Sequence, residues 1–345
     1  MPKGADRRER MDSINIREIA KIVGVSRSTV SRALNDGYVS KEIREQIYEV
    51  VNKLGYNRNM LAQKFRTNKS NFIGLIIPDI SNEFFAKLAR EIELFFMKNN
   101  YGLFLCNSEG NADIEDFYIK TLLENRVEAV IITPCTKAVN DRLAKSGIPF
   151  VFADREIPGL RSKQLAVVTS DNRHGGEIAA RELALRGAKR VLVVSDRHGT
   201  SSALLERLKG FKTTADDLGV EYIHHKIRFS IKEAEIQTNE MLKKEEFDAV
   251  FCTQDLIAVG VMKALSGAGI PIPDDIQVLG FDGLDIGDYL CRPLSTIKQD
   301  ISRIGIVAAE AMLTLIRGEE FPPRTVVPVE FIQRDTTKAM APTAT

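Results

Sequence analysis

The stretch IREIAKIVGVSRSTVSRALN, residues 16–35, predicts two short helices joined by a single glycine. In the first helix, apolar residues recur at helical spacing, at Ile16, Ile19, Ala20 and Val23. Gly24 supplies the turn, and Ser26 is placed to cap a second helix that ends at Leu34. The inward positions of the second helix are apolar: Val30, Ala33 and Leu34.

The outward positions of the second helix carry polar and basic side chains: Arg27, Ser28, Ser31 and Arg32. A short polar helix braced by another helix fits the major groove of B-DNA. The alternative interpretation is a small helical hairpin with a solvated face. The charge distribution favours DNA binding, because residues 1–70 hold 15 Lys and Arg against 8 Asp and Glu, whereas the remainder has a net charge of −6.

A third helix is predicted after the loop NDGYV, with Ser40 as its cap and Gly55 at its end. Its apolar stripe consists of Ile43, Ile47, Val50, Val51 and Leu54. The segment that follows, RNMLAQKFRTNKS at 58–70, is basic and polar and is typical of a linker. Its Leu61, Ala62 and Phe65 nevertheless share one face if the segment is helical.

The rest of the chain alternates short apolar runs with helical segments, which predicts α/β structure with parallel sheet covered on both faces. The runs lie at 72–78, 101–107, 129–134, 149–154, 166–171, 190–195, 249–254 and 277–282. Most of them end in a polar residue at the carboxyl end of the strand. Open α/β sheets bind ligands at that edge.

Several classes of function find no support in this sequence. No apolar run is long enough to span a membrane, and the charged start MPKGADRRERMD does not resemble a secretion signal, so a cytoplasmic protein is expected. The four cysteines are widely spaced and are expected to be buried, reduced thiols. No metal-ligand spacing, nucleophile turn, dinucleotide fingerprint or phosphate loop occurs, so neither an enzyme nor a cofactor or metal is expected.

Residues 14 to about 335 resemble the lactose-repressor (LacI/GalR) family of transcription regulators. The resemblance is carried by IREIAKIVGVSRSTVSRALN, VSKEIREQIYEVVNKLGY, IGLIIPDISNEFF, TSDNRHGG, VLGFD and STIKQD, in that order. It implies a multi-domain chain with an all-α helix-turn-helix head and an α/β two-lobed body like that of periplasmic sugar-binding proteins. It also implies a homodimer formed through the body and a ligand held between the lobes.

The resemblance sets the expected domains. Residues 1–13 are a disordered tail, 14–57 the DNA-binding domain, 58–70 a hinge helix or linker, and 71–340 the effector-binding and dimerisation domain. Within the body, one lobe is expected at about 71–165 and 297–325, and the other at about 166–294 and 326–340. No leucine heptads follow residue 335, so a coiled-coil tetramer is not expected.

In the head, the family geometry makes Arg27, Ser28 and Arg32 the candidate base readers. Arginine reads guanine O6 and N7 through two hydrogen bonds. Contacts to phosphate or sugar are implied for Thr29, Ser31, Asn35 and Tyr38. For each of these side chains the alternative is simple solvation.

The family's hinge helix folds on operator DNA and inserts an apolar side chain into the minor groove. The implied contacts within this segment are Arg58, Asn59, Ala62 and Phe65. Phe65 stands where many relatives carry leucine, and an aromatic ring can still unstack a base step. Arg58 replaces a proline that is usual there, which leaves the entry to the helix less pre-set. The alternative interpretation is a flexible tether.

In the body, a sugar site requires carboxylate, guanidinium and amide groups together with aromatic rings. Candidates at or near strand ends are Asn82, Phe84, Phe85, Asp154, Arg155, Arg207, Gln254, Asp282 and Gln299. This set resembles that of ribose-binding proteins, except that Gln254 replaces an asparagine, so ribose or another pentose is the first expectation. For Asp154 and Arg155 a mutual salt bridge is the alternative, and Asp79, Asp171 and Asp255 are equally explained as caps or partners of backbone amides.

The expected function is therefore a repressor of sugar-utilisation genes, in which an effector that closes the cleft changes the affinity for operator DNA. One variant of this hypothesis makes the controlling partner a phosphocarrier protein, as in the catabolite-control branch of the family. Two other classes of protein fit the sequence less well. A secreted sugar-binding protein has no use for residues 14–66, and a Rossmann-type enzyme requires a cofactor fingerprint.

Overall fold

The computed structural model describes residues 15–34, 37–54, 70–135, 138–160, 162–197 and 201–340. The chain divides into two compact units, Met1–Lys69 and Ser70–Thr345, which are described separately as the head and the body. No helix among the described residues is both long and apolar enough to cross a bilayer.

The head contains the three predicted helices, α1 (Ile16–Val23), α2 (Arg27–Leu34) and α3 (Lys41–Leu54). Its small core is formed by the predicted apolar faces: Ile19, Ala20, Val30, Ala33, Leu34 and Ile47. Gly24 ends α1 with a φ of 75°, a left-handed conformation that glycine adopts without strain. Asn15 caps α1 in a capping box with Glu18, a signal that the sequence prediction missed.

One side chain caps the start of α2, and another ties α3 to the end of α2. The Thr29 backbone N–H donates to Ser26 Oγ at 3.1 Å, so the predicted cap of α2 is confirmed. Arg44 of α3 donates to the carbonyl oxygens of Ala33 at 3.3 Å and Gly37 at 2.8 Å. Arg44 therefore ties α3 to the end of α2 and helps to hold the exposed face of α2 in place.

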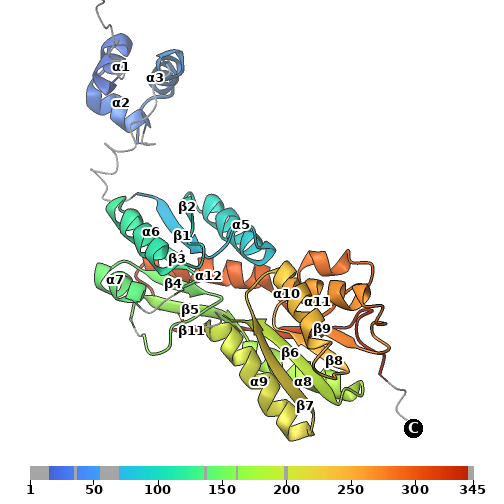
Figure 1. The fold of residues 1–345 in the computed structure, drawn as a ribbon. Coiled ribbons are helices and arrows are strands. Elements are labelled where there is room, and N and C mark those ends of the chain that lie inside the picture. Colours follow the sequence, from blue (N-terminus) through green and yellow to red (C-terminus); the bar gives the residue numbers. More distant parts are fainter. Residues whose placement is uncertain are drawn as a thin grey trace, which may run out of the picture. The chain divides into compact units, whose positions relative to one another are not determined.

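The body consists of two six-stranded sheets with helices on both faces (Figure 1). The first lobe contains β1 (Phe72–Ile77), α5 (Glu83–Lys98), β2 (Gly102–Asn107), α6 (Ala112–Glu124), β3 (Ala129–Ile132), α7 (Ala138–Ser146), β4 (Phe150–Ala153), β5 (Leu165–Ser170), α12 (Ile301–Ile316) and β11 (Arg324–Val327). The second contains α8 (Asn172–Leu185), β6 (Arg190–Asp196), α9 (Ser202–Leu218), β7 (Glu221–Ile227), α10 (Ile231–Met241), β8 (Ala249–Cys252), α11 (Asp255–Gly267), β9 (Gln277–Asp282), the short η1 (Asp285–Asp288), β10 (Ser295–Gln299) and β12 (Val329–Ile332).

The strand orders are β11-β5-β4-β3-β1-β2 and β12-β10-β9-β8-β6-β7, and all pairs are parallel except β10 with β12. All eight predicted strands are present, with ends that differ by no more than two residues. The prediction missed β7, β10, β11 and β12. The edge strand β7, EYIHHKI, is mostly half-exposed, so it lacks the continuous apolar run by which buried strands are recognised.

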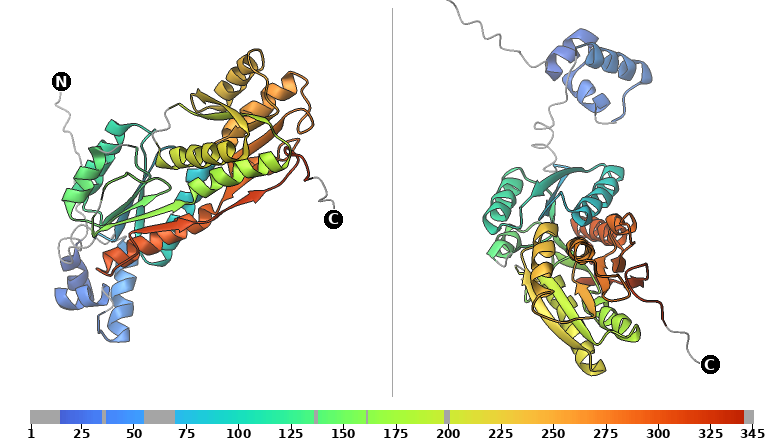
Figure 2. Two further views of the ribbon diagram at one scale, coloured as in Figure 1. Left: turned by 90° about the horizontal axis from the view of Figure 1, so that it is seen from below. Right: turned by 45° about the vertical axis from the view of Figure 1, so that its right-hand side comes forward.

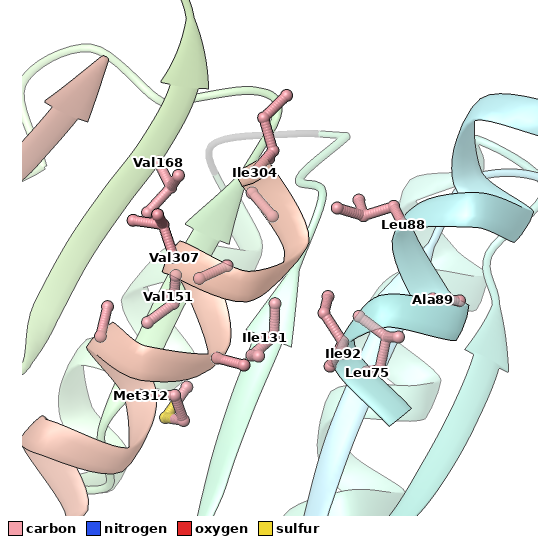
Figure 3. Packing of buried hydrophobic residues seen from close by; sticks show 14 of the residues in the cluster. Leu75, Leu88, Ala89, Ile92, Ile131, Val151, Val168, Ile304, Val307 and Met312 are labelled. Carbon is pink, nitrogen blue, oxygen red and sulfur yellow. The ribbon is translucent and has the colours of Figure 1, made fainter. Parts of the chain in front are cut away.

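Each sheet is covered by two apolar layers. In the first lobe, α5 and α12 pack on one face of the sheet, where Leu88 and Ile92 meet Ile304 and Val307 (Figure 3). Residues of α6 and α7 cover the opposite face. In the second lobe, α8 and α9 cover one face and α10 and α11 the other. These layers hold the carboxyl ends of both sheets in fixed positions.

The chain crosses between the lobes three times, and the crossings differ from the predicted boundaries. Strand β5 pairs within the first sheet, so that lobe extends to Ser170 rather than 165. Strand β10 belongs to the second sheet, and α12 returns to the first lobe only after Gln299. The third crossing lies at Pro328, between β11 and β12 (Figure 2). The predicted boundaries were wrong because strand pairing, which decides the lobe, leaves no mark in a local pattern.

Candidate functional site

A cavity of about 720 Å³ in the body is lined by residues of both lobes. All nine predicted effector residues line it: Asn82, Phe84, Phe85, Asp154, Arg155, Arg207, Gln254, Asp282 and Gln299. They come from segments up to about 200 residues apart, and the structure brings them to one place. The cavity lies at the carboxyl ends of the strands, where parallel sheets bind ligands.

Asp282 and Arg207 form the charged centre of the second lobe's wall. Arg207 donates from one terminal nitrogen to Asp282 Oδ1 at 3.0 Å, and Gln299 Nε2 donates to the same oxygen at 2.7 Å. All three side chains are buried. Among the described residues both donors use Oδ1, so the second carboxylate oxygen can accept from a ligand hydroxyl.

Three neighbours that sequence reasoning missed hold Arg207 in position. Its Nε donates to Asn172 Oδ1 at 2.8 Å, and a terminal nitrogen donates to the Thr253 carbonyl oxygen at 2.7 Å. The guanidinium carbon lies 3.7 Å from the ring centre of Phe281. Asn172 lies in the motif TSDNRHGG and Phe281 in VLGFD, so both residues stand in motifs that the sequence analysis quoted. Their contact with Arg207 could not be predicted from the sequence.

Two glycines allow α8 and α9 to approach closely enough to bring Arg207 into the wall. A Cβ added at Gly176 of α8 would lie 2.0 Å from the Arg207 carbonyl oxygen, and one at Gly210 of α9 would lie 2.0 Å from the Arg173 carbonyl oxygen. Real side chains do not tolerate such distances to backbone atoms. The two helices therefore touch backbone to backbone at this point.

Two of the acidic groups that line the cavity, Asp282 and Asp154, are electrostatically unusual. Burial raises the pKa of Asp282 to about 7, although Arg207 opposes the shift, and the nearby Asp255 and Asp154 add to it. Burial likewise raises the pKa of Asp154, against the attraction of Arg155 and Arg207. Both residues have a positive φ, 127° at Asp282 and 70° at Asp154. Strained carboxylates of this kind are concentrated at functional sites.

Two amide oxygens facing this site are unsatisfied. Oε1 of Gln254 and Oε1 of Gln299 are buried and accept no hydrogen bond from any residue in the described part of the chain. A buried acceptor without a donor costs roughly 1–3 kcal/mol. A ligand that brings hydroxyl donors would remove this cost.

The first lobe contributes the aromatic wall. Asn82 Oδ1 caps α5 by accepting from the Phe84 N–H at 3.0 Å. The rings of Phe84 and Phe85 meet edge to face with centroids 5.2 Å apart, and the guanidinium of Arg155 lies 5.5 Å from the Phe85 ring. The Asp154–Arg155 salt bridge, left open by the sequence, is present at 3.4 Å.

Two of the three uncertain aspartates are structural. Asp171 caps α8 by accepting from the His174 N–H at 3.1 Å. Asp255 accepts from the N–H groups of Gly283 and Leu284, both at 2.8 Å. Neither lines the cavity, whereas Asp79 does. Further lining residues that the sequence did not single out are Cys135, Ser202, Arg228 and Phe229.

The cysteines are free thiols, as predicted, but not all of them are buried. Cys106 and Cys252 are buried, Cys135 is half-buried, and Cys291 is exposed. The expectation of burial was wrong for Cys291, which lies in the turn region before β10 rather than in a strand. Among the described residues, no group of His, Cys, Asp and Glu is arranged to hold a metal ion.

In the head, Arg27, Ser28 and Arg32 lie on the exposed face of α2, with Thr29 and Ser31 half-buried beside them. Tyr38 is 93% exposed. The Ser26 hydroxyl is hydrogen-bonded to those of Ser28 at 2.7 Å and Thr29 at 2.8 Å. The predicted contacts Asn35, Arg58, Asn59, Ala62 and Phe65 lie outside the described residues.

A helix-turn-helix head joined to a two-lobed body with a polar cavity defines a DNA-binding regulator of the class that carries a binding-protein-like body. The chain belongs to the LacI family of bacterial regulatory proteins. The model of that family matches residues 15–59, and a periplasmic binding protein-like domain matches residues 180–337. A ribose operon repressor from Halalkalibacterium halodurans is 33% identical over 94% of this chain and 97% of its own length.

Two solved structures illustrate the likeness. A LacI family transcriptional regulator from Enterococcus faecium with bound ribose is 29% identical, with a TM-score of 0.70 over 77% of this chain and 98% of its own. The lac repressor dimer bound to operator and the anti-inducer ONPF matches 95% of this chain and 100% of its own with a TM-score of 0.85, but at 22% identity it shows the fold alone. The relatives are transcriptional repressors, so this chain is a transcription regulator and not an enzyme.

Proposed function

We propose that this regulator is a homodimeric repressor of sugar-utilisation genes and that its effector is a pentose, ribose first, bound in the cavity between the lobes. The observation that carries the proposal is the pair of unsatisfied oxygens, Oε1 of Gln254 and of Gln299, beside the Asp282–Arg207 pair. A polyol supplies many hydroxyl donors and acceptors in a small volume. The aromatic pair Phe84 and Phe85 gives its apolar face a surface to contact.

The relatives support this choice of ligand class. The relative that is 33% identical is a ribose operon repressor, and the structural neighbour with bound ribose covers 77% of this chain. No observation favours control by a phosphocarrier protein. An effector of this kind acts only if its affinity differs between two lobe arrangements, and cleft closure would then alter the spacing of the two heads. Operator DNA as partner makes the cytoplasm the expected location.

Calorimetric titration of the full chain with D-ribose, D-arabinose, D-xylose, D-glucose and adenine tests the ligand class. We expect binding of one pentose with a strong preference over the hexose and the base. Asp282→Asn weakens that binding by tenfold or more, because a hydroxyl donor loses its charged acceptor. Asp113→Asn, which alters an exposed carboxylate of α6 outside the cavity, is the matched control. If none of the four sugars binds, the proposal is contradicted.

DNA recognition is proposed to depend on Arg27 and Arg32. Neither makes a hydrogen bond or ion pair through its side chain with any described residue, so both are free to reach base edges. Arg27→Ala is expected to relax base preference at one operator position by about 1–3 kcal/mol, the value of a bidentate contact. Binding-site selection measures this, with Lys21→Ala as the control for loss of one exposed charge on α1. Unchanged preference would exclude Arg27 as a base reader.

A homodimer through the body is supported by the edge strand β2, where Phe104 and Leu105 are 38% and 47% exposed. Apolar edge strands associate unless they are covered. We expect a dimer in sedimentation velocity and a large shift toward monomer for Leu105→Lys. Leu218→Lys, which alters an equally exposed leucine of α9, should leave the dimer intact. A wild-type monomer at micromolar concentration contradicts this assignment.

A further inference from the structure

A second cavity, of about 490 Å³, lies in the second lobe between α9 and the strands β6 and β7. It is distinct from the sugar cavity in its lining, although Asp196 and Leu204 contribute to both. The apolar part of its lining consists of Leu204, Leu205 and Leu208, together with the ring of Tyr222. Nothing in the proposed sugar chemistry uses this cavity.

Four basic side chains gather around this cavity: Arg197, Lys209, Lys212 and Lys226. None of them forms an ion pair with a carboxylate in the described part of the chain, in contrast to many other lysines and arginines of the body. Two carboxylates also line the cavity, Asp196 and Asp216. The cations therefore outnumber the acids around one hollow, which is the arrangement that raises the local concentration of an anion.

Lys212 contacts two other residues of the cavity lining. Its ammonium lies 3.3 Å from His224 Nδ1 and 5.8 Å from the centre of the Tyr222 ring. His224 Nε2 lies 2.8 Å from Ser195 Oγ. Because an ammonium only donates, Nδ1 accepts and Nε2–H donates to Ser195, so the imidazole is neutral in this arrangement.

The electrostatics agree with this geometry. Burial, followed by repulsion from Lys212, Lys226 and His225, lowers the pKa of His224 to about 4. The imidazole therefore stays neutral at physiological pH and serves as an acceptor that orients Lys212. The positive potential in the cavity therefore comes from the three lysines and Arg197, and His224 adds no charge.

We propose that this cavity is a second ligand site, separate from the sugar site, that binds a phosphorylated small molecule. The phosphoryl oxygens contact Lys212, and Lys209, Lys226 and Arg197 surround the phosphoryl group. The apolar part of the lining contacts the rest of the ligand. Lysine and arginine are the usual partners of phosphate, and these four side chains form no ion pair with a carboxylate among the described residues. The site does not rest on the pentose assignment.

The test uses the full-length Asp282→Asn variant, in which sugar binding is expected to be weakened by tenfold or more, and titrates it calorimetrically with ribose 5-phosphate, inorganic phosphate and D-ribose. We expect ribose 5-phosphate to bind, inorganic phosphate to bind more weakly, and D-ribose to bind at least tenfold more weakly than it binds the wild-type protein. Raising the salt from 0.05 to about 0.5 M should weaken binding, since exposed charges are screened. The distinction from the sugar site is that wild-type protein saturated with D-ribose still binds the phosphate ester.

Lys212→Gln in the same background is expected to weaken ribose 5-phosphate binding by tenfold or more, and Lys226→Gln by a smaller factor. Lys163→Gln, which removes an exposed lysine of the first lobe, is the matched control. Equal binding by the Lys212→Gln and control variants, or no binding of either phosphate probe, overturns the proposal. A thermal midpoint within about 2 degrees of the parent in all variants excludes misfolding as the cause. If Lys212→Gln does not meet this criterion, Lys212→Arg takes its place: it retains the charge and should bind ribose 5-phosphate.

Discussion

Asp282 takes part in most of the polar contacts described for the cavity between the lobes. It ends β9 with a φ of 127°, it is buried, and it accepts from both Arg207 and Gln299. Its neighbour Phe281 supports the same arginine through its ring. A strained, buried carboxylate with a raised pKa is costly to the fold, and the cost is understandable if a ligand uses the group.

Affinity for the sugar is expected to depend on pH through Asp282. Because its pKa is raised to about 7, the carboxylate is mostly protonated at pH 6 and mostly ionised at pH 8. A ligand hydroxyl donates to the ionised form, so affinity should rise by about tenfold from pH 6 to pH 8, one proton being released on binding. Calorimetry at the two pH values measures this. In Asp282→Asn the dependence should disappear, and a pH profile shared by both proteins would contradict the role.

Unfolding of the ligand-free protein should show the opposite trend. The folded state keeps the Asp282 proton to about pH 7, whereas an unfolded carboxyl releases it near pH 4. The folded state therefore binds more protons in this window, and this group's contribution to the free energy of unfolding falls as pH rises from about 4 to 7. Comparing wild type with Asp282→Asn across that window isolates the contribution.

At the scale of elements, the contact of α8 with α9 explains why glycines stand in the motif TSDNRHGG. Gly176 and Gly210 let the two helix backbones touch, and Arg207 reaches the cavity from the contact. Gly175 allows α8 to pack closely on the sheet, because a Cβ there would lie 2.7 Å from the ring of Phe281 in β9. The glycines therefore help to position the site, although none of the three lines the cavity.

Gly176→Ala is expected to lower the free energy of unfolding by about 1–3 kcal/mol and to weaken sugar binding, because α9 must move away. Chemical denaturation and calorimetry measure the two effects. Gly267→Ala at the end of α11 is the control, since an added Cβ meets nothing within 4 Å there. That variant should be neutral or stabilised by up to about 1 kcal/mol. Similar behaviour of the two alanine variants would refute the close-contact explanation.

At the scale of the whole body, a polar contact joins the two lobes beside the cavity. Lys87 of α5 lies 2.7 Å from Glu83 Oε1 and 2.6 Å from Asp285 Oδ1 of η1. The Asp285 N–H also donates to Glu83 Oε1 at 2.7 Å. A second contact joins the lobes between the β4–β5 connection and α9, where the Glu156 N–H donates to Ser202 Oγ at 2.9 Å. Any change of lobe arrangement must break or adjust such contacts.

Glu83→Ala removes the acceptor of the Asp285 N–H and one partner of Lys87. We expect faster hydrogen exchange in residues 284–289 with a loss of less than about 1 kcal/mol in unfolding free energy, because the ion pairs are partly exposed. Exchange followed by mass spectrometry measures the local effect. Glu93→Ala, at an exposed position of the same helix, is the control. Unchanged exchange around η1 would show that this contact does not restrain the lobes.

Local patterns were sufficient for the three helices of the head, for eight strands of the body and for the side chains that follow those strands. The physical reason is that helical and strand periodicity, caps and turn residues act within a few residues of one another. They also placed Asp154, Gln254 and Asp282 at strand ends, where a ligand site was expected. The half-exposed strand β7 escaped because its pattern is not that of a buried strand.

Only the tertiary structure decided which polar groups face the cavity and which serve the backbone. Asp282 and Asp255 both lie at the carboxyl ends of strands. The Asp255 carboxylate accepts from the N–H groups of Gly283 and Leu284, whereas Asp282 lines the cavity. The lobe boundaries and the cluster around Lys212 likewise depend on strand order and helix packing. These are long-range properties, because pairing partners and the space left between packed helices are set by residues far apart in the chain.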